Sequence, residues 1–326
     1  MFEVGTIPET MMYAGATPWH STGTFVGDVG LEPIEAMRKA EIDWTVSKRG
    51  IVVPSVLGPI PVEDYRAIIR DSDQSILGIT GKDYQPLQNL ALAEFAGDLT
   101  GDGSMRIHTA GSLNGGKQVW MLGKVGSTEV VPNDKVDQFL FFHNGHGGKN
   151  AFRCLFTSVR VVCANTAQIA LQSAKGAGVS IRHTKNMEVR VGEARRILGI
   201  STKAFEESAE FMKKLAEIPM PTSDWIDFCL EMFPSPIEDE SGEVSKRAMT
   251  RADNNRSTIT SLFHDGRGSD IPGVRGTAWG AYNALTEYAG YYRQTRGGQD
   301  KRFESLMMGS GSDFVRRGTT VLRSLV

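Results

Sequence analysis

Apolar and polar residues alternate over much of the first 160 residues, which is the side-chain period of β-strands. The runs 65–70 and 75–80 predict two strands joined by a tight turn, because turn-forming residues occupy positions 71–74. A helix is predicted over 86–99, where apolar residues recur at every fourth position and so share one face. Further strands are predicted over residues 106–111, 118–125, 137–143 and 151–162.

The spacing of apolar residues changes to the helical period after residue 200. Amphipathic helices are predicted around 205–216, 225–233 and 278–292. We therefore predict an α+β fold, in which an antiparallel sheet core with packed helices is followed by a mainly helical C-terminal region. The predicted organisation is an irregular N-terminal segment (1–30), an α+β core domain (31–200) and a helical C-terminal region (201–326).

The composition is that of an ordinary folded protein, with 40% hydrophobic and 23% charged residues among 326. No apolar run approaches the roughly 20 residues that a membrane-spanning helix needs, and we expect neither a membrane span nor a secretory leader. Cys154, Cys163 and Cys229 show no CxxC spacing, which indicates reduced thiols in a cytoplasmic protein.

Charge is unevenly distributed along the chain. Residues 1–150 hold 12 Lys and Arg against 18 Asp and Glu, a net charge of −6, whereas 151–326 hold 24 against 20, a net charge of +4. The basic residues of the second half cluster, for example at Lys246-Arg247 with Arg251 and Arg256, and at Arg316-Arg317. Such clusters either bind phosphates or form solvated helix faces, and for any single cluster the second interpretation is favoured.

His143 and His146 are three residues apart and predict a low-probability metal site, since two neutral imidazoles can share a metal ion. The competing interpretation is an exposed hairpin tip, because Asn144-Gly145 is a strong turn dipeptide. No catalytic residue and no cofactor are predicted. The segment 111–117 resembles a phosphate-binding loop only in its glycine spacing and its lysine, and a hairpin between two strands accounts for it better.

Basic and aromatic residues are interleaved along the strand predicted over 151–162. Side chains alternate between the faces of a strand, so Phe152, Cys154 and Phe156 are expected to be buried and Arg153 exposed. Exposed cations beside a hairpin tip suit the tracking of a phosphate backbone. The candidate nucleic-acid-binding residues are Lys82, Lys117, Lys149, Arg153 and Arg160. Where this strand ends, Asn165 or Thr166 is predicted to cap a helix that runs to about Ser173.

Several segments together resemble a family of phage, plasmid and prophage proteins described as phage/plasmid-like proteins, a domain of unknown function. The resemblance covers most of residues 30–310 and supplies no established activity. The matching segments are Ala40-Glu41-Ile42-Asp43-Trp44-Thr45-Val46, Ile76-Leu77-Gly78-Ile79-Thr80, Tyr84-Gln85-Pro86-Leu87-Gln88-Asn89, Ala110-Gly111-Ser112 with Gly115-Gly116-Lys117, Asn144-Gly145-His146-Gly147-Gly148, Val159-Arg160-Val161-Val162-Cys163-Ala164-Asn165-Thr166 and Gly276-Thr277-Ala278-Trp279.

A weaker likeness, in organisation alone, is to the single-strand annealing recombinases of phages, which form rings or filaments. It implies a homo-oligomer that binds single-stranded DNA and promotes annealing in recombination or replication without covalent catalysis. The host cell cytoplasm is then the expected compartment. Two alternatives remain open at this point: a metal-dependent nuclease or hydrolase centred on His143 and His146, and a protein-interaction module that acts on a host or phage protein.

Overall fold

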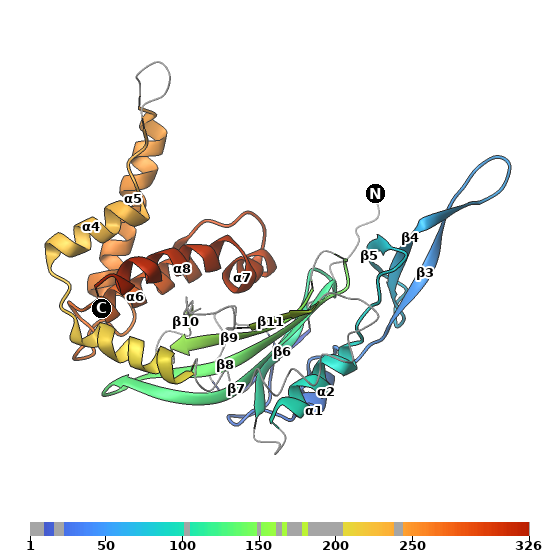
Figure 1. The fold of residues 1–326 in the computed structure, drawn as a ribbon, viewed down its shortest axis with the longest axis horizontal. Helices are drawn as coiled ribbons and strands as arrows, with labels where there is room; N and C mark the ends of the chain where they lie inside the picture. Colours follow the sequence, from blue (N-terminus) through green and yellow to red (C-terminus); the bar gives the residue numbers. More distant parts are fainter. Residues whose placement is uncertain are drawn as a thin grey trace. The chain divides into compact units, whose positions relative to one another are not determined.

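The structure is a computed structural model, and it describes residues 10–15, 23–100, 105–148, 151–160, 165–167, 178–181, 205–237 and 244–325. It confirms the α+β class, with two sheets followed by a helical C-terminal region (Figure 1). The chain divides into two compact units. The first contains 1–125, 139–156 and 173–203, and the second contains 126–138, 157–172 and 204–326.

The larger sheet has the strand order β10-β9-β8-β7-β6-β1-β2, and β11 pairs with β9 beside β10. β1 and β2 are parallel, whereas β1 with β6, β6 with β7, β9 with β10 and β9 with β11 are antiparallel, so the sheet is mixed. The strands are β1 Met11–Tyr13, β2 Thr24–Phe25, β6 Arg106–Leu113, β7 Gln118–Val131, β8 Asp134–Gly145, β9 Phe152–Arg160, β10 Asn165–Ala167 and β11 Gly178–Ile181.

Two helices, α1 (Pro33–Lys39) and α2 (Asn89–Thr100), cover one face of this sheet within the first unit (Figure 1). Their apolar sides meet the inward side chains of β6 to β9 in a single buried cluster that includes Phe95, Phe142 and Phe152. The ring centroids of Phe95 and Phe152 lie 4.9 Å apart in an edge-to-face arrangement. The predicted burial of Phe152, Cys154 and Phe156 is confirmed, whereas Arg153, predicted to be exposed, is half-buried.

The smaller sheet consists of β3 (Val46–Val53), β4 (Ile60–Arg70) and β5 (Ile76–Gly81), all antiparallel, and it contains the predicted hairpin over 65–80. β5 pairs with β4 only from Tyr65 onward, so β3 and the first part of β4 continue as a two-stranded ribbon. Apolar side chains remain exposed along that ribbon and its tip. They are Val52, Val53, Val56, Leu57 and Ile60.

The smaller sheet and the loop after β8 approach each other closely at Gly78. A Cβ at Gly78 would lie 2.6 Å from the Cα of Gly147, which is closer than non-bonded carbon atoms approach. We expect Gly78→Ala to lower the free energy of unfolding by about 1–3 kcal/mol, the usual effect of overpacking. Gly81→Ala is the matched control, because nothing lies within 4 Å of its added Cβ. Chemical denaturation measures both variants, and equal stabilities would contradict this packing.

The helical part of the second unit is built around α6 (Ala278–Glu287), which is buried along its whole length. A π-helical segment, η2 (Tyr288–Tyr292), continues α6. In the same unit, the buried rings of Trp225 and Phe263 stack at a centroid distance of 4.1 Å. The remaining helices are 205–217, α4 Thr222–Met232, α5 Lys246–Asp265, α7 Gln299–Met308 and α8 Ser310–Arg323.

One predicted element is different in the structure. Asn165 does not cap a helix, because Asn165–Ala167 forms β10 and pairs with the end of β9. The open edge of β9 offers backbone hydrogen-bonding groups to residues 165–167, and this pairing replaces a helix start there. The rest of the predicted helix, to Ser173, lies outside the described residues.

Candidate functional site

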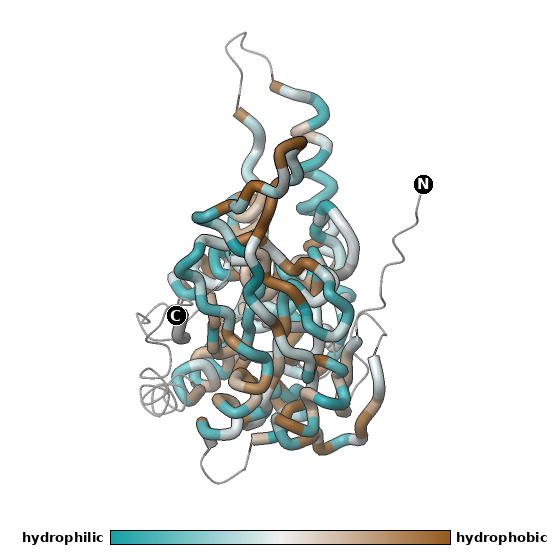
Figure 2. Tube along the Cα trace, turned by 90° about the vertical axis from the view of Figure 1, so that its right-hand side faces the viewer, coloured by the Kyte–Doolittle hydropathy of each residue, from teal (hydrophilic) through white to brown (hydrophobic). Residues whose placement is uncertain are grey.

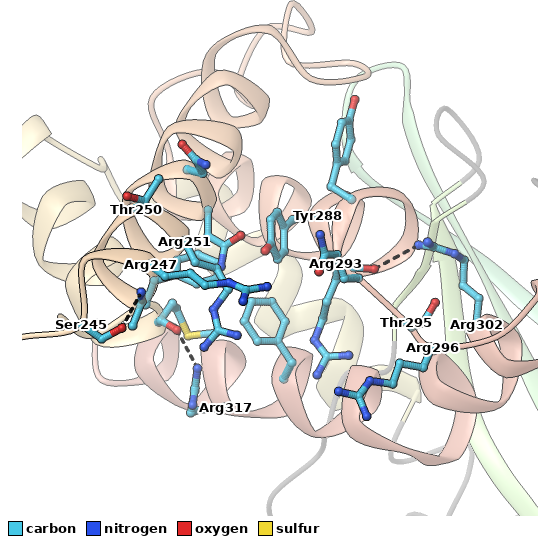
Figure 3. Close-up of a pocket in the computed structure, with 18 residues that line it drawn as sticks. Ser245, Arg247, Thr250, Arg251, Tyr288, Arg293, Thr295, Arg296, Arg302 and Arg317 are labelled. Atoms are coloured by element: carbon cyan, nitrogen blue, oxygen red, sulfur yellow. Dashed lines mark hydrogen bonds between the residues drawn. The ribbon is translucent and has the colours of Figure 1, made fainter. Parts of the chain in front are cut away.

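A large pocket lies within the helical part of the second unit (Figure 3). Its volume is about 1320 Å³. Six arginine side chains line it, and they come from α5, from the segment after η2, from α7 and from α8. They are Arg247, Arg251, Arg293, Arg296, Arg302 and Arg317.

Helix α5 supplies the first two of these arginines. Its start is fixed by Ser245, whose side chain accepts a hydrogen bond from the backbone N–H of Ala248. Arg247 and Arg251 are four residues apart and so share one helix face, and both are exposed. The first turns of α5, which follow the grey segment at the top of Figure 2, are mainly hydrophilic.

The π-helical segment shapes another wall of the pocket. π-Helical turns are rare and occur frequently at functional sites. η2 carries Tyr288 and Tyr292, which line the pocket, and the chain leaves the helix at Arg293 with extended backbone angles. Arg293 and Arg296 line the pocket from the non-helical segment that follows this change of direction.

Three aromatic rings pack together in the pocket lining. The centroid of Phe233 lies 5.1 Å from that of Tyr288 and 5.6 Å from that of Phe314, and Tyr288 and Phe314 are also 5.6 Å apart. The Cζ atoms of Arg293 and Arg317 lie 5.8 Å and 5.7 Å from the Phe314 centroid, within cation–π range. Burial raises the pKa of Tyr288, so its hydroxyl remains protonated and can donate a hydrogen bond.

Three of the arginines are held in place by hydrogen bonds that use only part of each guanidinium group. Arg317 donates from Nη2 to the Met232 carbonyl at 2.7 Å, and Arg302 donates from Nη1 to the Gly290 carbonyl at 2.9 Å. Arg293 donates from Nη1 to the Ser310 hydroxyl at 3.2 Å. A guanidinium carries five N–H donors, so each group is oriented and retains donors for a ligand.

The charge of this pocket is not neutralised by the part of the chain that the structure describes. The lining residues include no Asp or Glu, and none of the six arginines forms an ion pair with a described carboxylate. Other arginines of the same unit differ: Arg256 pairs with Asp253, and Arg316 pairs with Asp313. Neither of those paired arginines lines the pocket. Within the described ranges, the pocket lining therefore carries positive charge that no described side chain offsets, and guanidinium groups of this kind bind anions well.

The residues predicted from the sequence to bind nucleic acid do not come together in one site among the described residues. Lys82 forms an ion pair with Asp64, with 2.8 Å between Nζ and Oδ1. Lys117 is exposed in the turn between β6 and β7, and Arg153 is half-buried on β9. Arg160 ends β9 opposite Asn165, and its side chain lies outside the described part, as does all of Lys149. Lys82, Lys117 and Arg153 belong to the first unit and Arg160 to the second.

His143 and His146 are buried, so the interpretation of an exposed hairpin tip is wrong. The Nε2 atom of His143 lies 2.8 Å from the Gln118 side-chain oxygen, and that of His146 lies 2.9 Å from Asn89 Oδ1. Asn89 donates from Nδ2 to the carbonyls of Ile42 and Trp44, which leaves its Oδ1 to accept from His146. His146 Nε2 therefore carries a proton and is not a metal ligand in this arrangement.

No group of three or more metal-ligating side chains that could hold an ion occurs among the residues described by the structure. Nor does any helix in those ranges combine the length and apolar character needed to cross a membrane. Cys154 and Cys229 are buried free thiols, and burial raises their pKa values to about 12 and about 11. Raised values disfavour the nucleophilic thiolate.

The basic clusters in the sequence include three of the six pocket arginines, but they do not show that these arginines line one pocket. The clusters at Lys246-Arg247 with Arg251 and Arg256 and at Arg316-Arg317 were visible, but a solvated helix face was the favoured interpretation of each. Arg293, Arg296 and Arg302 lie far from α5 in the sequence, so no local pattern connects them to Arg247 and Arg251. Only the tertiary arrangement brings them to the same space as Arg247 and Arg317 (Figure 3).

Comparisons with known proteins add a family assignment. No curated protein and no solved structure matches the chain. One family model, described as a domain of unknown function (DUF932), matches residues 76–307. This range includes the smaller sheet's last strand, β6 to β9, and five of the six pocket arginines. The chain belongs to the DUF932 family.

Proposed function

We propose that this chain is a phage-type protein that binds single-stranded DNA and promotes annealing in recombination or replication, without covalent catalysis. The observation that carries the proposal is the pocket with six arginines and no acidic lining residue. The phosphates of the strand bind there, because guanidinium groups bind phosphate oxygens through paired hydrogen bonds.

The size and charge of the pocket favour a polyanion over a small anionic ligand. Pockets for small ligands commonly measure about 300–1000 Å³, and this pocket is larger, at about 1320 Å³. Two or three donors satisfy one phosphate, whereas six guanidinium groups supply charge for several phosphates in a row. Arg247, Arg251, Arg296 and Arg317 are exposed, so a long strand can reach them without entering a closed cavity.

This proposal moves the main phosphate contacts from the predicted residues to the C-terminal pocket. The charge of Lys82 is partly compensated by Asp64, and Arg153 is half-buried. Lys117 is exposed and remains a candidate for a secondary contact. The proposal is tested by the binding and annealing of labelled oligonucleotides, which should proceed without nucleotide or metal and should fail in variants that reverse charges in the pocket.

We also propose that the chain acts as a homo-oligomer and that the ribbon of β3 and β4 contacts a second copy. Val56 and Leu57 at its tip are fully exposed, with relative exposures of 103% and 97%. Each copy carries the same apolar tip, so pairing about a twofold axis would cover two tips at once. Burying a fully exposed side chain of this kind contributes about 1.5–3 kcal/mol.

We expect the double variant Val56→Asp/Leu57→Asp to have a lower molar mass than the parent protein in light scattering. Val29→Asp/Ile237→Asp is the matched control, because those apolar residues are also exposed but lie outside the ribbon. A parent protein that is already monomeric would contradict the oligomer. In that case the exposed ribbon would favour the second candidate function, an interaction module for a host or phage protein.

A further inference from the structure

Tyr292 differs from the other aromatic residues that line the arginine pocket. Phe233, Tyr288 and Phe314 pack against one another, so their ring faces are largely covered. Tyr292 is 52% exposed. Within the described residues its ring stacks on no other ring and on no guanidinium group, whereas the neighbouring ring of Tyr291 lies under Arg267, with 4.4 Å between Cζ and the centroid.

The position of Tyr292 in the chain connects it to the charged part of the pocket. It is the last residue of the π-helical segment, and Arg293 follows it directly. Both residues line the pocket, and Arg293 is oriented by its bond to Ser310 and its contact with Phe314. In a nucleotide, the base and the phosphate are also close together. Two consecutive residues such as Tyr292 and Arg293 can therefore contact the base and the phosphate of one nucleotide.

We infer that Tyr292 stacks on an unpaired base of the strand whose phosphates the pocket arginines bind, which makes the site selective for single-stranded nucleic acid. This inference rests on the proposed function. Aromatic side chains stack on any base, since every base has a π-face, and the contact is therefore independent of sequence. In a duplex both faces of each base are covered by neighbouring base pairs, so the Tyr292 ring gains nothing from a double strand.

The test compares two probes that carry the same phosphates, a thymidine oligonucleotide and an abasic oligonucleotide of equal length. Tyr292→Ala should weaken binding of the thymidine probe by about tenfold, within the range known for base stacking, and leave binding of the abasic probe unchanged. Tyr292→Phe keeps the ring and should bind both probes like the parent protein. The salt dependence of binding should be the same in all three proteins, because no phosphate contact is removed.

Two outcomes would overturn the inference while the proposed function stands. In the first, Tyr292→Ala binds the thymidine probe as tightly as the parent does, while variants of the pocket arginines lose binding. In the second, Tyr292→Ala loses the same affinity for both probes, which would mean that the pocket itself had changed. If the parent protein binds neither probe at low salt, the proposed function fails and the inference fails with it. Circular dichroism confirms that each variant is folded.

Discussion

Replacing Arg247 and Arg251 together by glutamate is expected to weaken the binding of single-stranded oligonucleotides by about 100-fold, with no loss of stability. Both side chains are exposed on one face of α5 and line the pocket. A hydrogen bond to a charged group contributes roughly 1.5–3 kcal/mol, which corresponds to about tenfold or more in affinity for each lost contact. The glutamates also repel phosphate, so the loss exceeds that of an alanine pair.

Fluorescence anisotropy of a labelled oligonucleotide measures this loss at fixed salt. The matched control is Lys301→Glu/Arg316→Glu, which changes the net charge of the protein by the same amount in the same unit. Lys301 and Arg316 form exposed ion pairs with Glu304 and Asp313 and do not line the pocket. We expect the control to bind nearly as tightly as the parent protein. Equal losses in the two double variants would show that net charge, and not the pocket, governs binding.

Asn89→Ala is expected to lower the free energy of unfolding by about 3 kcal/mol, because it removes the partner of several buried polar groups at once. Asn89 is 1% exposed. Its amide donates to the carbonyls of Ile42 and Trp44 at 2.9 Å and 3.2 Å, and its oxygen accepts from His146 at 2.9 Å. These bonds attach the segment before β3 and the loop after β8 to the start of α2. Without them the two carbonyls and the imidazole remain buried with fewer partners.

Thermal unfolding followed by circular dichroism measures this effect, and a loss of about 3 kcal/mol corresponds to a decrease of roughly 4–5 °C in Tm for a chain of 326 residues. Leu90→Ala is the control, since Leu90 is the next residue of α2 and is 46% exposed. Its Tm should stay close to that of the parent. If Asn89→Ala were as stable as Leu90→Ala, the buried network would not contribute to stability as we describe.

The elements with strong local periodicity were predictable from the sequence. The hairpin over 65–80, α2 and β6 to β9 all show the period of their class over several residues, and the structure confirms them. Asn165 could not be placed in the same way. A helix cap and a short edge strand use similar residues, and the unpaired edge of β9 decided between them.

The histidine segment shows how a local turn signal can mislead. Asn144-Gly145 is typical of an exposed turn, but β5 and the start of α2 pack over this segment, and His146 is buried against Trp44 and Asn89. Trp44 and Asn89 lie 102 and 57 positions before His146 in the chain, so no local pattern reports this covering. The arginine pocket was missed for a related reason, because α5, the segment after η2, α7 and α8 each contribute only one or two of its cations.

The salt dependence of oligonucleotide binding by the parent protein tests the central claim most directly. Each phosphate contact to a single strand contributes a slope of about −0.7 to the plot of log K against log salt concentration, so six pocket arginines predict a slope of up to about −4. The Arg247→Glu/Arg251→Glu variant should show a slope shallower by about 1.4, corresponding to two lost contacts. Undetectable binding by the parent protein at low salt, or an identical slope in the folded variant, would contradict phosphate binding by this pocket.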